Sequence, residues 1–155
     1  MKGNEEIVIG LFDKFKREGN NDFESACSKM GAELVALYLQ EKGIAFETMS
    51  ELERQVLAVY FFGMADGLRQ DISANEGADK IAKTVINVLM KEFKYSENQT
   101  GQFFNSIVDD LQSKDPTNTQ YAIIHKGLYG YFKWKDGNKN DVIANVCQII
   151  DILNK

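Results

Sequence analysis

Apolar residues recur along this chain at spacings of three and four, which is the period of an α-helix with one buried face. Such spacing predicts an all-α fold of six or seven helices, because no convincing alternating strand competes with it. The β-branched run at residues 7–9 leaves a short strand as the alternative to the first of these helices. The expected helices cover about residues 4–18, 22–42, 50–71, 73–89, 96–111, 115–134 and 140–153.

Helix starts are marked by capping boxes, in which a serine and a glutamate or glutamine three residues later satisfy each other's backbone N–H groups. Asn21 or Asp22 is expected to cap the helix that runs to residue 42. Asp115 and Pro116 fit an N-cap followed by the first helical residue, where a missing N–H costs nothing. The capping boxes are Ser50 with Glu53, Ser73 with Glu76, and Ser96 with Gln99.

Helix ends are marked by glycines. Gly43 followed by Ile44 predicts a Schellman ending, with the isoleucine folding back on the last turn. The run Asp136-Gly137-Asn138 is expected to break the next-to-last helix. Connectors are short, so consecutive helices should be neighbours in a compact bundle.

Residues 121–134 stand out because they place apolar or aromatic side chains on nearly every side of a helix. A helix that is apolar all round is normally buried, so we expect this one to be the central helix of the bundle. It also holds Gly127 and Gly130, each of which costs a helix about 1 kcal/mol relative to alanine. Close approach of another backbone would offset that loss.

The helix expected at residues 50–71 is the natural partner for this approach. It has two wide apolar sides, and Gly63 and Gly67 are four residues apart on it. Two small residues at that spacing form a smooth groove in which a second helix can cross. We therefore expect Gly63 and Gly67 to face the glycines at 127 and 130.

The chain of 155 residues is expected to form a single domain, residues 1–155. Cys27 and Cys147 fall on apolar helix faces, which favours free, buried thiols over a disulfide between them. No apolar run is long enough to span a membrane, and the acidic start lacks the pattern of a signal peptide. These features favour a cytoplasmic protein.

Charge is unevenly distributed around the net value of −5. Residues 1–77 carry 14 acidic and 8 basic residues, whereas residues 78–155 carry 9 acidic and 10 basic residues. An acidic surface repels nucleic acid and attracts basic partners. The alternative is an acidic surface that serves solubility alone.

Sequence motifs that commonly bind metals or phosphates are missing. One histidine and two buried cysteines do not make a zinc site of the usual composition, and glycine-rich phosphate loops are absent from the sequence. Asp109 and Asp110 are adjacent on a helix and would point about 100° apart, which is a poor geometry for chelation. The sequence predicts no metal and no cofactor.

His125 is the only histidine and could act as a general base. Its chain neighbours offer nothing to orient the ring, so a buried, hydrogen-bonded histidine is the favoured interpretation. Lysines interleaved with aromatic residues in the same region could bind nucleic acid, although the negative total charge favours a solvated edge instead. These lysines are Lys126, Lys133, Lys135 and Lys139, near Tyr129, Tyr131 and Trp134.

The block IIHKGLYGYFKW, residues 123–134, resembles a motif of the all-α immunity proteins of bacterial polymorphic-toxin systems, specifically the family numbered forty-eight. That motif has the form I-I-H-R-G-x-x-G-H-x-x-W. Lys126 stands where arginine is usual, and Tyr131 where a second histidine is usual. The segment FFGMADGL, residues 61–68, is similar to the aromatic-FGM segment of the family, and the likeness extends over most of residues 34–153.

This resemblance implies a protein that binds and neutralises a cognate toxin without catalysis. The toxin would commonly be a nuclease or another effector with a basic surface, which agrees with the acidic first half. If the motif is a surface feature, its residues touch the partner; if it is a packing feature, it shapes the bundle. A helical hydrolase or transferase using His125, and a helical DNA-binding regulator, are the alternatives.

Two sets of site residues follow from the resemblance and the charge pattern. The partner-binding candidates are His125, Lys126, Tyr129, Glu33, Glu41, Glu47 and Asp66. The residues expected to shape the bundle are Gly63, Gly67, Gly127, Gly130 and Trp134.

Overall fold

The computed structural model describes residues 23–72 and 77–155, and within them every regular element is a helix. The predicted all-α class is thereby confirmed. The predicted helix at 4–18 and the capping box of Ser73 and Glu76 lie outside the described residues. The elements are a first helix over residues 23–42, η1 (Phe46–Thr48), α2 (Glu51–Asp71), α3 (Ala78–Glu92), α4 (Glu97–Ser113), α5 (Thr119–Lys135) and α6 (Lys139–Leu153).

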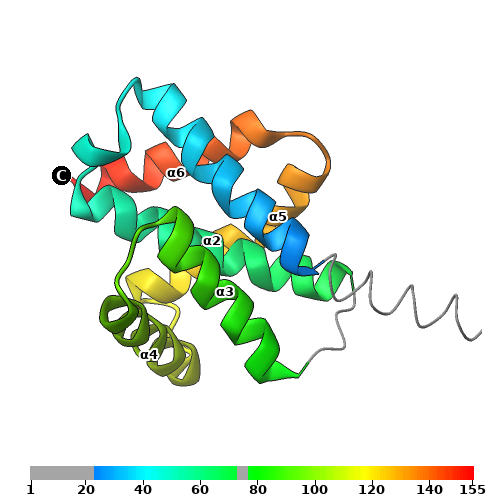
Figure 1. Ribbon diagram of the computed structural model, residues 1–155. Coiled ribbons are helices and arrows are strands. Elements are labelled where there is room, and N and C mark those ends of the chain that lie inside the picture. Colours follow the sequence, from blue (N-terminus) through cyan, green and yellow to red (C-terminus); the bar gives the residue numbers. More distant parts are fainter. Residues whose placement is uncertain (1–22, 73–76) are drawn as a thin grey trace, which may run out of the picture.

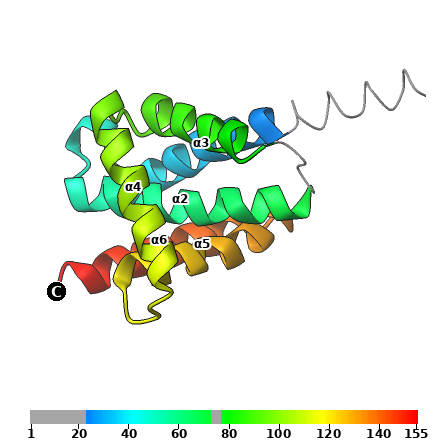
Figure 2. The same cartoon turned by 90° about the horizontal axis from the view of Figure 1, so that it is seen from below.

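The helices pack in layers around α2 (Figure 1). Seen from below, the first helix and α3 lie on one side of α2, and α5 and α6 lie on the other (Figure 2). Helix α4 crosses the edge of these layers and contacts both α3 and α5. Eleven of the 21 residues of α2 are buried, so α2 is the central helix.

The prediction that the helix at 121–134 would be buried all round is wrong. Only one face of α5 packs on the bundle, and on the opposite face Tyr129 is 70% and Phe132 42% exposed. His125 is exposed as well, contrary to the favoured interpretation of a buried histidine. The prediction failed because it treated every aromatic residue on the helix as buried, and the sequence pattern does not show whether another element covers that residue.

Local capping matches the sequence at several helix ends. Both capping boxes that fall within the described residues are formed, at Ser50 with Glu53 and at Ser96 with Gln99. Gly43 adopts a positive φ of 63°, and the N–H of Ile44 donates to the carbonyl of Leu39 at 3.1 Å. This is the predicted Schellman ending.

Two other helix starts differ from prediction. Helix α5 begins at Thr119, where the Asn118 side chain accepts the N–H of Tyr121 at 2.9 Å. The Asp115 carboxylate instead accepts the N–H of Thr117 at 3.0 Å, which is a local turn that competes with a helix cap. Helix α3 begins after Gly77, which makes no side-chain cap.

The two cysteines are free, as predicted. Cys27 is buried, and burial raises the pKa of its thiol to about 12. Cys147 is only half-buried, which corrects the expectation of full burial. Near the C-terminus, Leu153 is exposed. None of the described helices combines the length and apolar character needed to cross a membrane.

Candidate partner-binding face on α5

The inner face of α5 touches α2 backbone to backbone. A Cβ atom built on Gly63 would lie 2.0 Å from the carbonyl oxygen of Ile124. One built on Gly127 would lie 2.2 Å from the carbonyl oxygen of Tyr60. No side chain fits at those separations, so both positions accept only glycine without movement of a helix.

The second glycine of each pair makes room for a ring. A Cβ on Gly67 would lie 2.8 Å from the Cβ of Tyr131, and one on Gly130 would lie 2.1 Å from the hydroxyl oxygen of Tyr60. The Tyr60 ring thus passes beneath α5 through the space that a side chain at position 130 would fill. The sequence predicted that the two glycine pairs would face each other. The structure brings Gly63 against Gly127, whereas Gly67 and Gly130 each face a tyrosine of the other helix.

Polar contacts fix the C-terminal half of α5 to the end of α2. The Asp71 carboxylate accepts the Tyr131 hydroxyl at 2.7 Å and the Lys135 ammonium at 2.8 Å. These hydrogen bonds from Lys135 and Tyr131 hold the pKa of Asp71 below its ordinary value. Burial, together with the bond to Asp71, raises the pKa of Tyr131.

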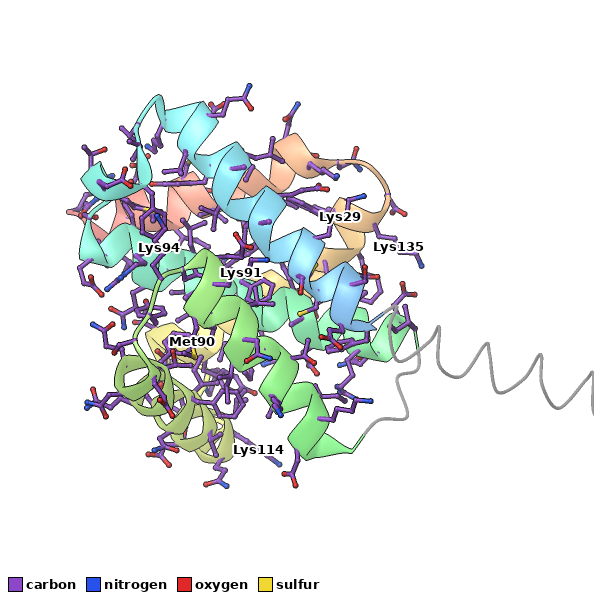
Figure 3. The ribbon with its side chains drawn as sticks, in the orientation of Figure 1. Lys29, Met90, Lys91, Lys94, Lys114 and Lys135 are labelled. Carbon is purple, nitrogen blue, oxygen red and sulfur yellow. The ribbon has the colours of Figure 1, made fainter. Side chains whose placement is uncertain are left out.

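Trp134 is buried and connects three helices. The Lys139 ammonium lies 5.0 Å from the centre of its ring and donates to the Glu33 carboxylate at 2.6 Å. These contacts tie the first helix to the turn between α5 and α6. Lys29 and Lys135 project on the same side of the molecule, where the first helix meets that turn (Figure 3).

The opposite face of α5, which we call the outer face, is exposed. Its residues fall at spacings of one, three and four, so they project from one side of the helix. The outer face consists of His125, Lys126, Tyr129, Phe132 and Lys133. It combines two aromatic rings, one imidazole and two lysines.

His125 lies at the start of the outer face, with its ring edge-on to Tyr121 at a centroid distance of 4.5 Å. Within residues 23–72 and 77–155, no carboxylate hydrogen-bonds to the imidazole. A general base is normally oriented by such a partner. The environment of His125 therefore gives no specific support to acid–base chemistry at this residue.

The four lysines of this region divide into two kinds. Lys135 and Lys139 form ion pairs with Asp71 and Glu33 respectively. Lys126 and Lys133 are exposed on the outer face and form no ion pair with any described residue. Of these four lysines, the two that remain available to a partner are therefore on the outer face.

The four acidic candidates lie on elements other than α5. Glu33 pairs with Lys139 and Lys29, and Glu47 lies 3.8 Å from Lys94. Asp66 pairs with Arg69 at 2.8 Å, whereas Glu41 is exposed at the end of the first helix. The structure does not gather these acids with the outer face into one site.

No group of three or more metal-ligating side chains occurs among the described residues. Asp110 and Asp109 were weighed as metal ligands in the sequence analysis. In the structure, Asp110 accepts a hydrogen bond from Gln120 at 2.6 Å. That bond joins α4 to α5 and gives Asp110 a structural partner.

Sequence reasoning missed some residues of this region. Phe132 and Lys133 follow Tyr129 by three and four positions, so helical spacing could have placed them on the outer face once Tyr129 was assigned there. The Tyr60 hydroxyl, Asp141 and Asn145 reach the same region from α2 and α6. Their approach depends on tertiary packing, for which the sequence carries no local signal.

Comparison with known proteins identifies the family. A family model described as Immunity protein 48 matches residues 30–154, which include both glycine pairs and the whole outer face. No curated protein and no solved structure matches the chain. Because the match spans most of its length, the chain belongs to the Immunity protein 48 family.

Proposed function

We propose that this protein neutralises a cognate toxin by binding it, without catalysis, through the outer face of α5. Membership of an immunity protein family supports the function. The observation that carries the site is the exposure of two aromatic side chains on a well-anchored helix, Tyr129 at 70% and Phe132 at 42%. Aromatic residues are enriched among the side chains that dominate binding energy at protein interfaces.

The inner face of α5 supports this role because it makes the outer face rigid. Direct backbone contact at Gly63 and Gly127 leaves α5 little freedom to shift relative to α2. The ties from Asp71 to Tyr131 and Lys135 act at the other end of the helix. A surface already held in its binding geometry loses less conformational entropy on association.

The acidic candidates would contribute over longer distances. The net charge of −5 attracts an effector with a basic surface, such as a nuclease, and raises the association rate. In this proposal Glu33, Glu41, Glu47 and Asp66 belong to that field, whereas His125, Lys126 and Tyr129 make the close contacts. The toxin would then be blocked by occlusion.

Co-expression with the toxin encoded by the adjacent gene tests the proposal. The wild-type protein is expected to restore growth and to co-purify with the toxin as a stable complex. Complex formation should slow with added salt, because screening weakens long-range attraction. A toxin that stays lethal and free of the protein would overturn the proposed function.

A further inference from the structure

A small hollow lies between α5 and α6 beside the outer face, and we call it the α5–α6 pocket. Its volume is about 200 Å³, which is below the range of about 300–1,000 Å³ typical of sites for whole small molecules. A single side chain of a partner is the matching size. Its polar and aromatic lining comes from Tyr60, Lys126, Tyr129, Lys133, Asp141 and Asn145.

Tyr60 supplies the most unusual group of this pocket. The residue is 1% exposed, and its hydroxyl reaches the pocket through the gap left by Gly130. Among the described residues, none hydrogen-bonds to this hydroxyl. The hydroxyl keeps a small contact with solvent at the pocket, so it is free to donate to a ligand atom that enters there.

The charges around the pocket favour an anion. Lys126 and Lys133 lie two helical turns apart on α5 and both line the pocket. Asp141 is the one acid in the lining, so the balance is positive. Burial raises the pKa of Tyr60 to about 12, which keeps its hydroxyl protonated and able to donate to an anion.

We infer that the α5–α6 pocket receives an aspartate or glutamate side chain of the toxin. The Tyr60 hydroxyl would donate to the carboxylate, and Lys126 and Lys133 would pair with it at the rim. The Tyr129 ring would cover the methylene groups of the inserted side chain. This inference rests on the proposed function, because it names the anchor by which the outer face holds its partner.

Asp141 is the acidic residue of the pocket lining. Its carboxylate opposes a second negative charge in the pocket, so Asp141→Asn should strengthen carboxylate binding. Removing an acid from a protein that binds a basic partner through its acidic field would instead weaken association. The direction of this one change therefore separates local recognition from general charge attraction.

A titration without the toxin tests the pocket directly. N-acetyl-glutamate N-methylamide is the probe, its neutral glutamine analogue is the control, and amide chemical shifts of the ¹⁵N-labelled full chain report binding. We expect saturable shifts confined to Gly130, Val142 and Asn145 with the acidic probe alone. Tyr60→Phe should weaken that binding about tenfold, as loss of a hydrogen bond to a charged group does. Equal shifts with both probes, or none, would overturn the inference.

The toxin complex supplies the second measurement. Tyr60→Phe and Lys126→Glu should each weaken the complex by about tenfold or more, and Asp141→Asn should tighten it. Lys91→Glu is the matched control, because Lys91 is exposed on α3, on the far side of α2 from α5 (Figures 2 and 3). It should leave the affinity within about twofold.

These outcomes distinguish two failures. If wild-type protein binds the toxin but Tyr60→Phe and Lys126→Glu bind it equally well, the anchor is wrong and the proposed function stands. If wild-type protein neither binds nor neutralises the toxin, the proposed function fails, and the anchor assigned to the toxin fails with it. The acidic probe then reports only whether the pocket accepts a carboxylate.

Discussion

The two faces of α5 obey different physical rules although they belong to the same 17 residues. The inner face is defined by missing side chains, since Gly127 touches the backbone of Tyr60 in α2. The outer face is defined by exposed side chains, among them Tyr129, which is 70% exposed. One face therefore holds the helix in place and leaves the other free for a partner.

Substitutions that act on one face of α5 at a time test this difference between the two faces. Changes on the inner face should reduce the free energy of unfolding, whereas changes on the outer face should leave it unaltered. The expected effects decrease from backbone overlap, through a single hydrogen bond and the protonation of a carboxylate, to an exposed ring.

The largest effect is expected from Gly127→Ala. Its Cβ would lie 2.2 Å from the carbonyl oxygen of Tyr60, so α5 and α2 must separate and the contact along both helices is lost. We expect the free energy of unfolding to fall by about 3 kcal/mol or more, as in severe overpacking. Urea denaturation followed by circular dichroism measures this change.

Gly101→Ala is the control for this prediction. Gly101 also lies within a helix, but nothing approaches the position of its Cβ within 4 Å. Alanine should stabilise α4 there by about 0.5–1 kcal/mol, because glycine is the poorer helix former. Equal responses at positions 101 and 127 would contradict the distinction between open and contacting glycines.

Tyr131→Phe is expected to have a smaller effect. The substitution removes the 2.7 Å hydrogen bond from Tyr131 to Asp71 but keeps the buried ring. The free energy of unfolding should fall by about 1 kcal/mol, the usual net value of one hydrogen bond. The exposed counterpart, Tyr129→Phe, should change it by less than about 0.5 kcal/mol. A larger loss at position 129 would reverse the assignment of the two faces.

Acid should weaken the contact between Glu53 in α2 and Tyr38 in the first helix. Burial by itself would raise the pKa of this carboxyl, but hydrogen bonds from Tyr38 and Ser50 outweigh burial and leave the pKa below its ordinary 4.5. A depressed pKa means that the stabilisation is fully present above pH 4.5 and is lost as pH falls through the folded-state value. Denaturation midpoints between pH 7 and pH 3 should therefore fall less steeply for Glu53→Gln than for the wild type. Parallel curves would contradict this role.

The smallest effect on stability is expected at His125. Its exposed ring touches Tyr121 and no carboxylate among the described residues, so His125→Gln should change the free energy of unfolding by less than about 0.5 kcal/mol. Thermal denaturation checks this expectation. A loss comparable with that at Tyr131 would show that the imidazole belongs to the packed face.

Helix existence and many helix ends could be predicted from sequence because they depend on neighbouring residues. Ser50 caps α2 and Gly43 ends the first helix through hydrogen bonds within a few positions. Even locally, two motifs can compete, and Asp115 formed a turn with Thr117 in preference to capping α5.

The orientation of α5 could not be predicted, since it depends on which helix arrives against which face. The glycines at 63 and 127 indicated close contact with another helix. Lys126 and Lys133 favoured an exposed edge, but the aromatic character of Tyr129 and Phe132 pointed to burial of the same side. The α5–α6 pocket was harder still, because Tyr60 reaches it from α2 through the gap at Gly130. Such a site exists only after three helices have packed.

We propose that the outer face of α5 binds the toxin and contributes nothing essential to the fold. The most direct test is to measure toxin affinity and the free energy of unfolding together for the double variant Tyr129→Ala, Phe132→Ala. We predict that affinity falls by about 100-fold or more while the free energy of unfolding changes by less than about 1 kcal/mol. Unchanged affinity in a folded double variant would contradict the claim.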